Sequence, residues 1–290
     1  MALIPAPAHV PAPARRAAQV AAVGVGRLTS GGRMRPSFLI AGAQRCGTTS
    51  LYRALSQHPA IVKAVLHKGV HYFDVGYHHG PDWYLGHFPL RATGRRAAGG
   101  PAMTFESSPY YLFHPLAAAR IAQDLPGVRV IVLIRDPVER AYSAHAHELA
   151  RGYETESFER ALSLEADRLD GEEARLTADP GYASHSHQHH AYRGRGQYAE
   201  QLERLAAAVG RDHIHVVDSA DFFSRPGPTY DALLGFLGLP HPGYPVFERH
   251  NARPRTAPMP GRLWAELDDY FQPHDERLAA WLGTTPSWRR

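Results

Sequence analysis

The sequence predicts a single-domain α/β fold, a doubly wound parallel sheet flanked by helices, from three observations. Short apolar runs alternate along the chain with stretches whose apolar residues recur at helical spacing. A turn with two glycines and three hydroxyl residues follows the first apolar run. The run at residues 128–134 is continuous and rich in β-branched side chains, which is typical of a central strand buried on both faces.

The expected elements follow from these runs in chain order. Strands are predicted at residues 38–41, 61–66, 102–105, 128–134 and 213–217. Helices are predicted at residues 51–55, 81–85, 115–123, 137–150, 157–169, 197–209, 220–223 and 229–237, with a last helix pair at 262–282. Residues 94–101 are predicted to form a flexible surface loop, and residues 171–196 a mobile loop rich in histidine.

The ends of the chain and its single cysteine bear on domain organisation and compartment. Residues 1–35 are predicted to be a disordered arm before a domain of residues 36–290, because residues 5–13 are mostly proline and alanine. No run approaches the ~20 apolar residues that span a membrane, and the short run at 20–26 is too interrupted by glycine for an export signal. Cys46 has no partner for an intrachain disulfide, so the cytoplasm is the expected compartment.

The charge balance limits the class of ligand. The 290 residues carry a formal net charge of +4, and nearly all the cations are arginine. So small and dispersed an excess suits an anionic small molecule and does not indicate nucleic acid. The four histidines of the expected mobile loop follow no standard metal-ligand spacing and have no cysteine beside them, so we expect a solvated loop and no metal site there. These are His185, His187, His189 and His190.

The turn after the first strand is the strongest candidate binding site. Gly42 and Gly47 match the glycines of the nucleotide-triphosphate loop G-x-x-x-x-G-K-[ST], but Thr48 replaces its phosphate-binding lysine, and the cation lies inside the turn at Arg45. The N–H groups of such a turn and of the helix start attract phosphate. We therefore predict a P-loop-like anion site unlike that of an ATPase, with an ordinary strand-to-helix turn as the alternative. Its candidate residues are Arg45, Cys46, Gly47, Thr48, Thr49 and Ser50.

A second anion site is predicted where the run at 128–134 ends. Nucleotide triphosphatases commonly have an Asp there that helps to hold Mg²⁺, whereas this chain has Arg135. Asp136 as N-cap, Pro137 at the first helical position and Glu139 at the third form a good helix start, so Asp136 is expected to serve as a cap. Arg135 and Ser143, two helical turns further on, could hold one phosphate between them without a metal. The alternative is a surface Arg and an unrelated helical Ser.

Two metal-free anion sites on one sheet would suit a nucleotide that carries phosphate at both ends of its ribose. The ligand 3′-phosphoadenosine 5′-phosphosulfate (PAPS), a sulfuryl donor, is such a molecule. Ligands of doubly wound sheets bind at the carboxyl ends of the strands. Arg45, Glu106 and Arg135 each follow a predicted strand, so all three are expected to face one crevice.

Several ordered motifs resemble those of PAPS-dependent sulfotransferases of the carbohydrate type, the group that includes the heparan sulfate sulfotransferases. The resemblance covers most of residues 37–290. Residues 42–49 resemble the 5′-phosphosulfate loop, with its usual Lys at Arg45, and residues 134–140 with Ser143 resemble the 3′-phosphate signature. Residues 70–74 resemble the family's V-H-F-F-D segment, and residues 82–84 resemble the W-Y that follows that segment. Residues 106–110 resemble E-K-[ST]-P. Residues 196–198 and 264–288 resemble the C-terminal part of the family.

The resemblance implies a mechanism and its residues. The hydroxyl or amine of an acceptor attacks sulfur in line, and adenosine 3′,5′-bisphosphate leaves. Arg45 would stabilise the charge that grows on the leaving group, and Arg135 with Ser143 would hold the 3′-phosphate. Arg253 and Arg255 fall where the family's basic loop closes over the donor; a solvated basic loop is the alternative. Carbohydrates, glycolipids and small metabolites all stay open as acceptors.

The general base is the point where the chain departs from the family. The heparan sulfate members have a Glu directly before V-H-F-F-D, and this chain has Gly69. Glu106 and His71 are the candidate replacements, with Asp74 placed to orient His71. The departure also leaves open a protein that binds PAPS without turnover. A P-loop nucleotide kinase or NTPase is the other alternative, against which Thr48 argues.

Overall fold

A parallel sheet lies at the centre of the protein, and the computed structural model describes it together with the rest of residues 21–250 and 259–290. Neighbouring strands are all parallel and follow the order β2-β3-β1-β4-β5. Each predicted strand is present, although β2 is shorter than expected, which confirms the doubly wound α/β class. The strands are β1 (Phe38–Gly42), β2 (Ile61–Lys63), β3 (Met103–Ser107), β4 (Arg129–Ile134) and β5 (Ile214–Asp218).

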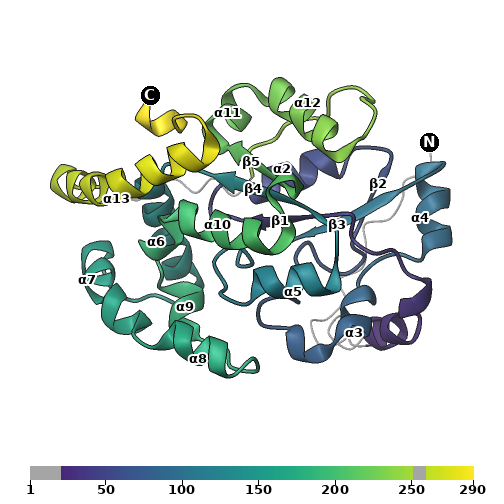
Figure 1. Cartoon of the computed structure of the whole chain (residues 1–290), viewed down its shortest axis with the longest axis horizontal. Coiled ribbons are helices and arrows are strands. Elements are labelled where there is room, and N and C mark those ends of the chain that lie inside the picture. The colour runs from purple at the N-terminus through teal and green to yellow at the C-terminus, as the bar shows by residue number, and fades with distance from the viewer. Residues whose placement is uncertain (1–20, 251–258) are drawn as a thin grey trace, which may run out of the picture.

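Helices flank the sheet on both faces (Figure 1). They are α2 (Thr48–Leu55), α3 (Pro81–Leu85), α4 (Arg91–Ala98), α5 (Ala117–Asp124), α6 (Pro137–Arg151), α7 (Phe158–Leu169), α8 (Glu172–Ala178), α9 (His185–His189), α10 (Tyr198–Val209), α11 (Ser219–Ser224), α12 (Pro226–Leu237) and α13 (Gly261–Leu282). Helices α5 and α10 lie side by side on one face, and α10 also packs against α13. Helix α2 packs against β1 and β3.

The sheet has its switch point at β1. In the sheet, β3 and then β2 lie on one side of this central strand, and β4 and then β5 lie on the other. All five residues of β1 are buried, as their uninterrupted apolar character predicts for a strand covered on both faces. The crevice outside the carboxyl ends of β1 and β4 is where such sheets bind ligands.

The predicted loop at residues 94–101 is wrong, because residues up to Ala98 belong to α4. Gly94 suggested a flexible segment, but a glycine is needed here because Met34 packs directly against its Cα. A Cβ built on Gly94 would lie only 2.3 Å from the sulfur of Met34. The predicted helix pair at 262–282 is likewise one helix, α13, which continues through Pro273. Its buried side chains keep helical spacing across the proline at Leu267, Phe271 and Leu278.

The predicted mobile loop at residues 171–196 is also wrong, because it contains α8, α9 and a short 3-10 turn at Gly194–Gly196. Its histidines pack as aromatic side chains. The buried ring of His187 stacks on Phe113 at a centroid distance of 4.3 Å, and its Nδ1 lies 2.7 Å from the hydroxyl oxygen of Tyr110. The segment is therefore ordered by partners that come from the β3–α5 connection.

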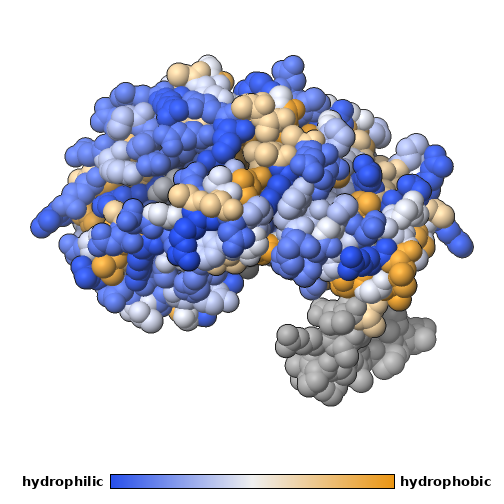
Figure 2. All heavy atoms as spheres, turned by 60° about the horizontal axis from the view of Figure 1, so that its bottom comes forward, coloured by the Kyte–Doolittle hydropathy of each residue, from blue (hydrophilic) through white to orange (hydrophobic). Residues whose placement is uncertain are grey.

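The described part of the predicted arm is ordered as well. Residues 21–28 are helical, and residues 1–20 lie outside the described part of the chain. The backbone N–H of Met34 donates to the carbonyl of Pro89 at 2.9 Å, which ties this segment to the α3–α4 region. Val25 and Leu28 are exposed in this segment. Figure 2 shows apolar side chains gathered at the lower right of the surface. In residues 21–250 and 259–290, no helix combines the length and apolar character needed to cross a bilayer.

Candidate active site

The turn after β1 is shaped by two residues with left-handed backbone. Gly47, with a φ of 91°, is the N-cap of α2, and Arg45 has a φ of 70°. A non-glycine residue in this region costs on the order of 1 kcal/mol, and such strain is concentrated at functional sites. At Gly42 a Cβ would lie 2.7 Å from that of Leu112, so only glycine fits. The turn thus presents the first N–H groups of α2 to the carboxyl end of the sheet.

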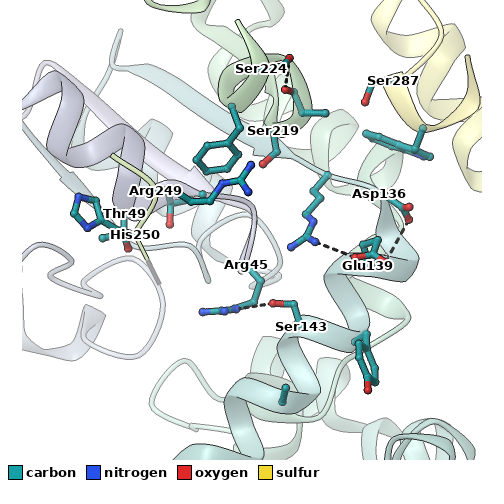
Figure 3. Close-up of a pocket in the computed structure, with 18 of the residues that line it drawn as sticks. Arg45, Thr49, Asp136, Glu139, Ser143, Ser219, Ser224, Arg249, His250 and Ser287 are labelled. Atoms are coloured by element: carbon teal, nitrogen blue, oxygen red, sulfur yellow. Dashed lines mark hydrogen bonds and ion pairs between the residues drawn. The ribbon is translucent and has the colours of Figure 1, made fainter. Parts of the chain in front are cut away.

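A cavity of about 1030 Å³ opens over this turn (Figure 3). Residues from the ends of β1, β4 and β5 meet there, as expected at a switch point. Five of the predicted donor-site residues besides Gly47 line it, namely Arg45, Thr48, Thr49, Arg135 and Ser143. Arg45 and Arg135 therefore line one cavity, whereas Glu106, which was expected to face the same crevice, is fully buried and does not line it.

Two guanidinium groups reach into the cavity from different strand ends. Arg45 donates from Nε to the hydroxyl of Ser143 at 3.1 Å, which links the turn to α6 (Figure 3). Arg135 forms an ion pair with Glu139 at 3.0 Å, and its side chain is 33% exposed. Ser143 is thus hydrogen-bonded by Arg45, whereas the sequence suggested Arg135 as its neighbour. The two cations and the start of α2 can attract an anion, although the carboxylates of Asp136 and Glu139 also line the cavity.

Asp136 is engaged in capping, as the sequence predicted. Its Oδ1 accepts from the backbone N–H groups of Val138 at 2.9 Å and Glu139 at 3.3 Å, with Pro137 in the first helical position. The carboxylate that would otherwise be the nearest metal ligand therefore serves the start of α6. Among the described residues, no group of three or more His, Cys, Asp and Glu side chains is arranged to hold a metal ion.

Cys46 and Ser50, two further predicted donor-site residues, have side chains that serve the scaffold. Burial raises the pKa of the fully buried Cys46 thiol to about 11, so it stays protonated and unreactive. Its carbonyl accepts from the hydroxyl of Ser219 at 2.9 Å, which joins the turn to the end of β5. Ser50 accepts from the backbone N–H of His250 at 2.9 Å and so holds a later segment over α2.

The sequence prediction missed an aromatic and basic wall of the same cavity. Phe223 and Trp288 line it, and the guanidinium of Arg249 lies over the Phe223 ring at 4.6 Å (Figure 3). Trp288 is fixed by its indole N–H, which donates to Asp275 at 2.9 Å. For Phe223 alone there was a usable signal, because its helix α11 directly follows β5 and every parallel strand ends at the same edge. Arg253 and Arg255 fall outside the described residues.

His71 and Asp74 form a close pair, although neither residue lines the cavity over the turn. The ring Nδ1 of His71 lies 2.7 Å from Oδ2 of Asp74; the imidazole is 41% exposed and the carboxylate is fully buried. His71 has a φ of 56°, and its backbone N–H donates to the hydroxyl of Ser108 at 3.0 Å. Burial lowers the pKa of His71, but the charge and hydrogen bond of Asp74 outweigh it, so the pKa is raised overall.

Glu106, the second candidate base, is surrounded by donors inside the protein. Its carboxylate accepts from the N–H of Val70 at 3.0 Å, the hydroxyl of Ser108 at 2.6 Å and the hydroxyl of Tyr111 at 2.6 Å. The residue has no exposed surface, and burial raises its pKa despite these bonds. Glu106 therefore fixes the backbone on which His71 stands.

Gly69 departs from the family pattern for a steric reason. A Cβ built on Gly69 would lie 2.5 Å from the carbonyl oxygen of Ser107 and 3.0 Å from the hydroxyl of Ser108. A glutamate at this position would require the end of β3 to move. The backbone around Gly69 therefore leaves no room for the glutamate side chain that the heparan sulfate members have at this position.

The turn is also fixed from the side of α9, by a network that the sequence did not reveal. Gln44 accepts from buried Arg195 at 3.0 Å and donates to Glu148 at 2.9 Å. His189 in turn lies 3.0 Å from the same carboxylate. The histidine-rich segment therefore helps to hold the turn after β1 in place.

Comparison with known proteins identifies the family. A model of the sulfotransferase domain family matches residues 35–249 of the chain. The chain belongs to this family. A solved sulfotransferase structure from Alicyclobacillus acidocaldarius superposes with a TM-score of 0.66 at 30% identity, covering 89% of this chain and 100% of that one. The P-loop-like fold and the family resemblance read from the sequence are both confirmed.

Curated relatives of this sulfotransferase domain are longer proteins. The membrane-associated sulfotransferase kil1 of Dictyostelium discoideum is 25% identical over 320 residues, which is 88% of this chain and 66% of that protein. The human bifunctional heparan sulfate N-deacetylase/N-sulfotransferase 3 is 29% identical over 290 residues, 88% of this chain and 31% of that protein. The chain thus spans under a third of the heparan sulfate relative and slightly less than two thirds of kil1.

Proposed function

We propose that this protein transfers a sulfuryl group from PAPS to a hydroxyl or amine of a carbohydrate, glycolipid or small-metabolite acceptor. The observation that carries the proposal is the shared cavity, which Arg45 and Arg135 enter from two strand ends beside the first turn of α2. A nucleotide with phosphate groups at both ends of its ribose is complementary to two such separated cationic sites. The heparan sulfate named for the relatives supports a carbohydrate acceptor.

The donor would lie along the cavity with its two anionic ends in different places. The 5′-phosphosulfate would bind Arg45, Thr48, Thr49 and the backbone N–H groups at the start of α2. The 3′-phosphate would bind Arg135 and Ser143, with Glu139 turning from Arg135 to other partners. The adenine would contact the wall formed by Phe223 and Trp288, while Arg253 and Arg255 would close over the donor.

The acceptor would be activated by His71. In the transfer, the acceptor oxygen or nitrogen forms a bond to sulfur, and the bond between sulfur and the bridging oxygen of the donor breaks. The electron pair stays on adenosine 3′,5′-bisphosphate, where Arg45 stabilises it. The acceptor proton passes to Nε2 of His71, and Asp74 stabilises the resulting imidazolium. Glu106 is assigned a positioning role, because its carboxylate oxygens already accept bonds from Val70, Ser108 and Tyr111.

Binding of adenosine 3′,5′-bisphosphate tests the donor assignment directly. Isothermal titration calorimetry on the purified chain should detect binding without a divalent ion. Arg135→Ala should weaken it by about tenfold to a hundredfold, since a charge-assisted hydrogen bond contributes roughly 1.5–3 kcal/mol. Arg53→Ala, an exposed arginine in the last turn of α2, is the matched control and should bind normally. Unchanged affinity in Arg135→Ala would refute the donor site.

A PAPS-binding protein without turnover is the second candidate, and the glycine at position 69 is the observation that favours it. Incubation with labelled PAPS and a panel of sugars, glycolipids and small glycosylated metabolites separates the two. Transfer of label to any acceptor supports the enzyme. Donor binding with no transfer to any member of a broad panel supports the binding protein.

The buried thiol of Cys46 is compatible with the reducing cytoplasm that we propose as the compartment.

A further inference from the structure

Lys68 approaches the turn after β1 from the side opposite α6. Its ammonium group donates to the hydroxyl of Thr49 at 2.9 Å and lies 3.5 Å from that of Thr48. Its carbonyl accepts from the backbone N–H of Ser107 at 2.8 Å, so the backbone of Lys68 is anchored to the end of β3. Thr48 and Thr49 both line the cavity. The lysine therefore stands directly behind two hydroxyl groups that face the donor pocket.

The environment of this ammonium group is unusual for a lysine. It is held by hydroxyl groups, and within the described residues no carboxylate oxygen lies at ion-pair distance from it. Burial lowers its pKa to about 8, although the charge of Glu106 acts in the opposite direction. A half-buried cation without a close counter-ion is costly. A bound anion next to Thr48 and Thr49 would offset that cost.

The composition of the chain singles out this residue. The sequence has 32 lysines and arginines, and only two of them, Lys63 and Lys68, are lysines. Lys63 is an exposed residue of the edge strand β2. Lys68 is the one that contacts Thr48 and Thr49 of the cavity wall, where a compact ammonium with three donor directions can serve both hydroxyl groups.

We infer that Lys68 is a positioning residue for the phosphosulfate group of the donor, acting with the hydroxyls of Thr48 and Thr49. A hydroxyl that accepts a bond from the ammonium points its own proton into the cavity, toward a phosphate or sulfuryl oxygen. Arg45, bonded to Ser143, lies on the α6 side of the turn, and Lys68 on the β3 side. The two cations thus hold the transferring group from both sides. Lys68 stays protonated throughout and exchanges no proton with the reactants.

This inference rests on the proposed function, and calorimetry with adenosine 3′,5′-bisphosphate separates the two. Wild-type protein should bind the nucleotide. Lys68→Met, which keeps an unbranched chain and removes the charge, should bind about tenfold to a hundredfold more weakly. Lys63→Met is the matched control and should bind as wild type. If wild type binds and Lys68→Met binds equally well, the inference fails while the proposed function stands; if wild type itself does not bind, both fail.

Two further readouts exclude a merely structural role. In wild type, the affinity for adenosine 3′,5′-bisphosphate should fall by about tenfold between pH 7 and pH 9.5, because the ammonium group of Lys68 deprotonates. The other titratable groups that face Lys68 are Glu106 from β3, Tyr52 from α2 and His71 on its own segment, and the same pH series on Lys68→Met corrects for them.

Chemical rescue completes the test. Lys68→Cys alkylated with 2-bromoethylamine restores an ammonium of similar reach, and the buried Cys46 is protected from the reagent. Binding and its pH dependence should return together. A flat pH profile in wild type, or a rescued protein that binds no better than Lys68→Cys, would overturn the inference even if Lys68→Met fails to fold.

Discussion

At the scale of single residues, the site depends on side chains whose backbone is held in uncommon conformations. His71 adopts a left-handed φ of 56°, which an L-residue reaches only at a cost of about 1 kcal/mol. The bonds from its N–H to Ser108 and from its ring to Asp74 offset that cost. The chain therefore supports an unfavourable local geometry in order to aim the imidazole.

The pH dependence of catalysis follows from this pair. A general base must be neutral, so turnover should fall as the pH decreases through the pKa of His71, which lies above its ordinary value of 6.5. Asp74→Asn removes the negative charge that raises this pKa, and the acid limb of kcat should shift to lower pH. His71→Ala should lower kcat by about 10²–10⁴-fold with little change in nucleotide affinity. An acid limb that persists unshifted in both variants would exclude His71 as the base.

Residue identities predicted which side chains line the cavity better than they predicted the surroundings of the two candidate bases. Arg45 and Arg135 could be placed in one crevice because each directly follows an apolar strand, and parallel strands end at one edge. The sequence could not show which of the two candidate bases, Glu106 or His71, is engaged by hydrogen-bond donors inside the protein. It depends on which donors surround the carboxylate, and Val70 and Tyr111 come together only in the folded sheet.

At the scale of elements, the strands and most helices were predictable because each buries an apolar face of regular period. The exceptions in the described chain are α4, α8, α9 and the helical residues 21–28. Helix α4 carries a glycine that the packing of Met34 requires, and α9, in which three of five residues are histidine and the other two are polar, has no apolar period. Its partner Phe113 lies more than seventy positions away in the chain, at a centroid distance of 4.3 Å from His187. Such tertiary contacts override local pattern.

The connection between α6 and α7 should make stability depend on pH. Burial raises the pKa of Glu154, but the two hydrogen bonds from Arg168, at 2.7 and 3.2 Å, and those from nearby N–H groups lower it to about 2. A carboxyl whose folded pKa is depressed adds stability above its unfolded pKa of about 4.5, and that stability is lost as the pH falls toward 2. Urea titrations should show a loss of roughly 2–3 kcal/mol on acidification.

The Arg168→Met variant isolates this interaction. At pH 7 its free energy of unfolding should fall by about 2–3 kcal/mol, because the buried carboxylate loses its partner. The difference from wild type should shrink toward pH 2, where Glu154 becomes protonated in both proteins. Arg160→Met, an exposed arginine on the same helix α7, is the control and should change little. Equal acid sensitivity of wild type and Arg168→Met would contradict the assignment.

At the scale of the whole molecule, the cavity is a product of topology. Its walls come from the turn after β1, from β4 and α6, from β5 and α11, and from the C-terminal Trp288. The order β2-β3-β1-β4-β5 was not predicted strand by strand, and it is what makes these segments neighbours. The aromatic wall escaped sequence reasoning for that reason, since Phe223 and Trp288 are 65 positions apart and have no shared motif.

Because the ligand would bridge all these segments, donor binding should stabilise the entire fold. Adenosine 3′,5′-bisphosphate at a hundred times its Kd should add about 2.7 kcal/mol to the free energy of unfolding, a rise in Tm of about 5 °C for a domain of this size. Excess EDTA should leave the shift intact, since the proposed binding of both phosphate groups involves no metal. Arg135→Ala should reduce it, and Mg-ATP, which lacks the 3′-phosphate, should give a smaller one. A rise in Tm with Mg-ATP, but none with adenosine 3′,5′-bisphosphate, would point to a nucleotide kinase or NTPase.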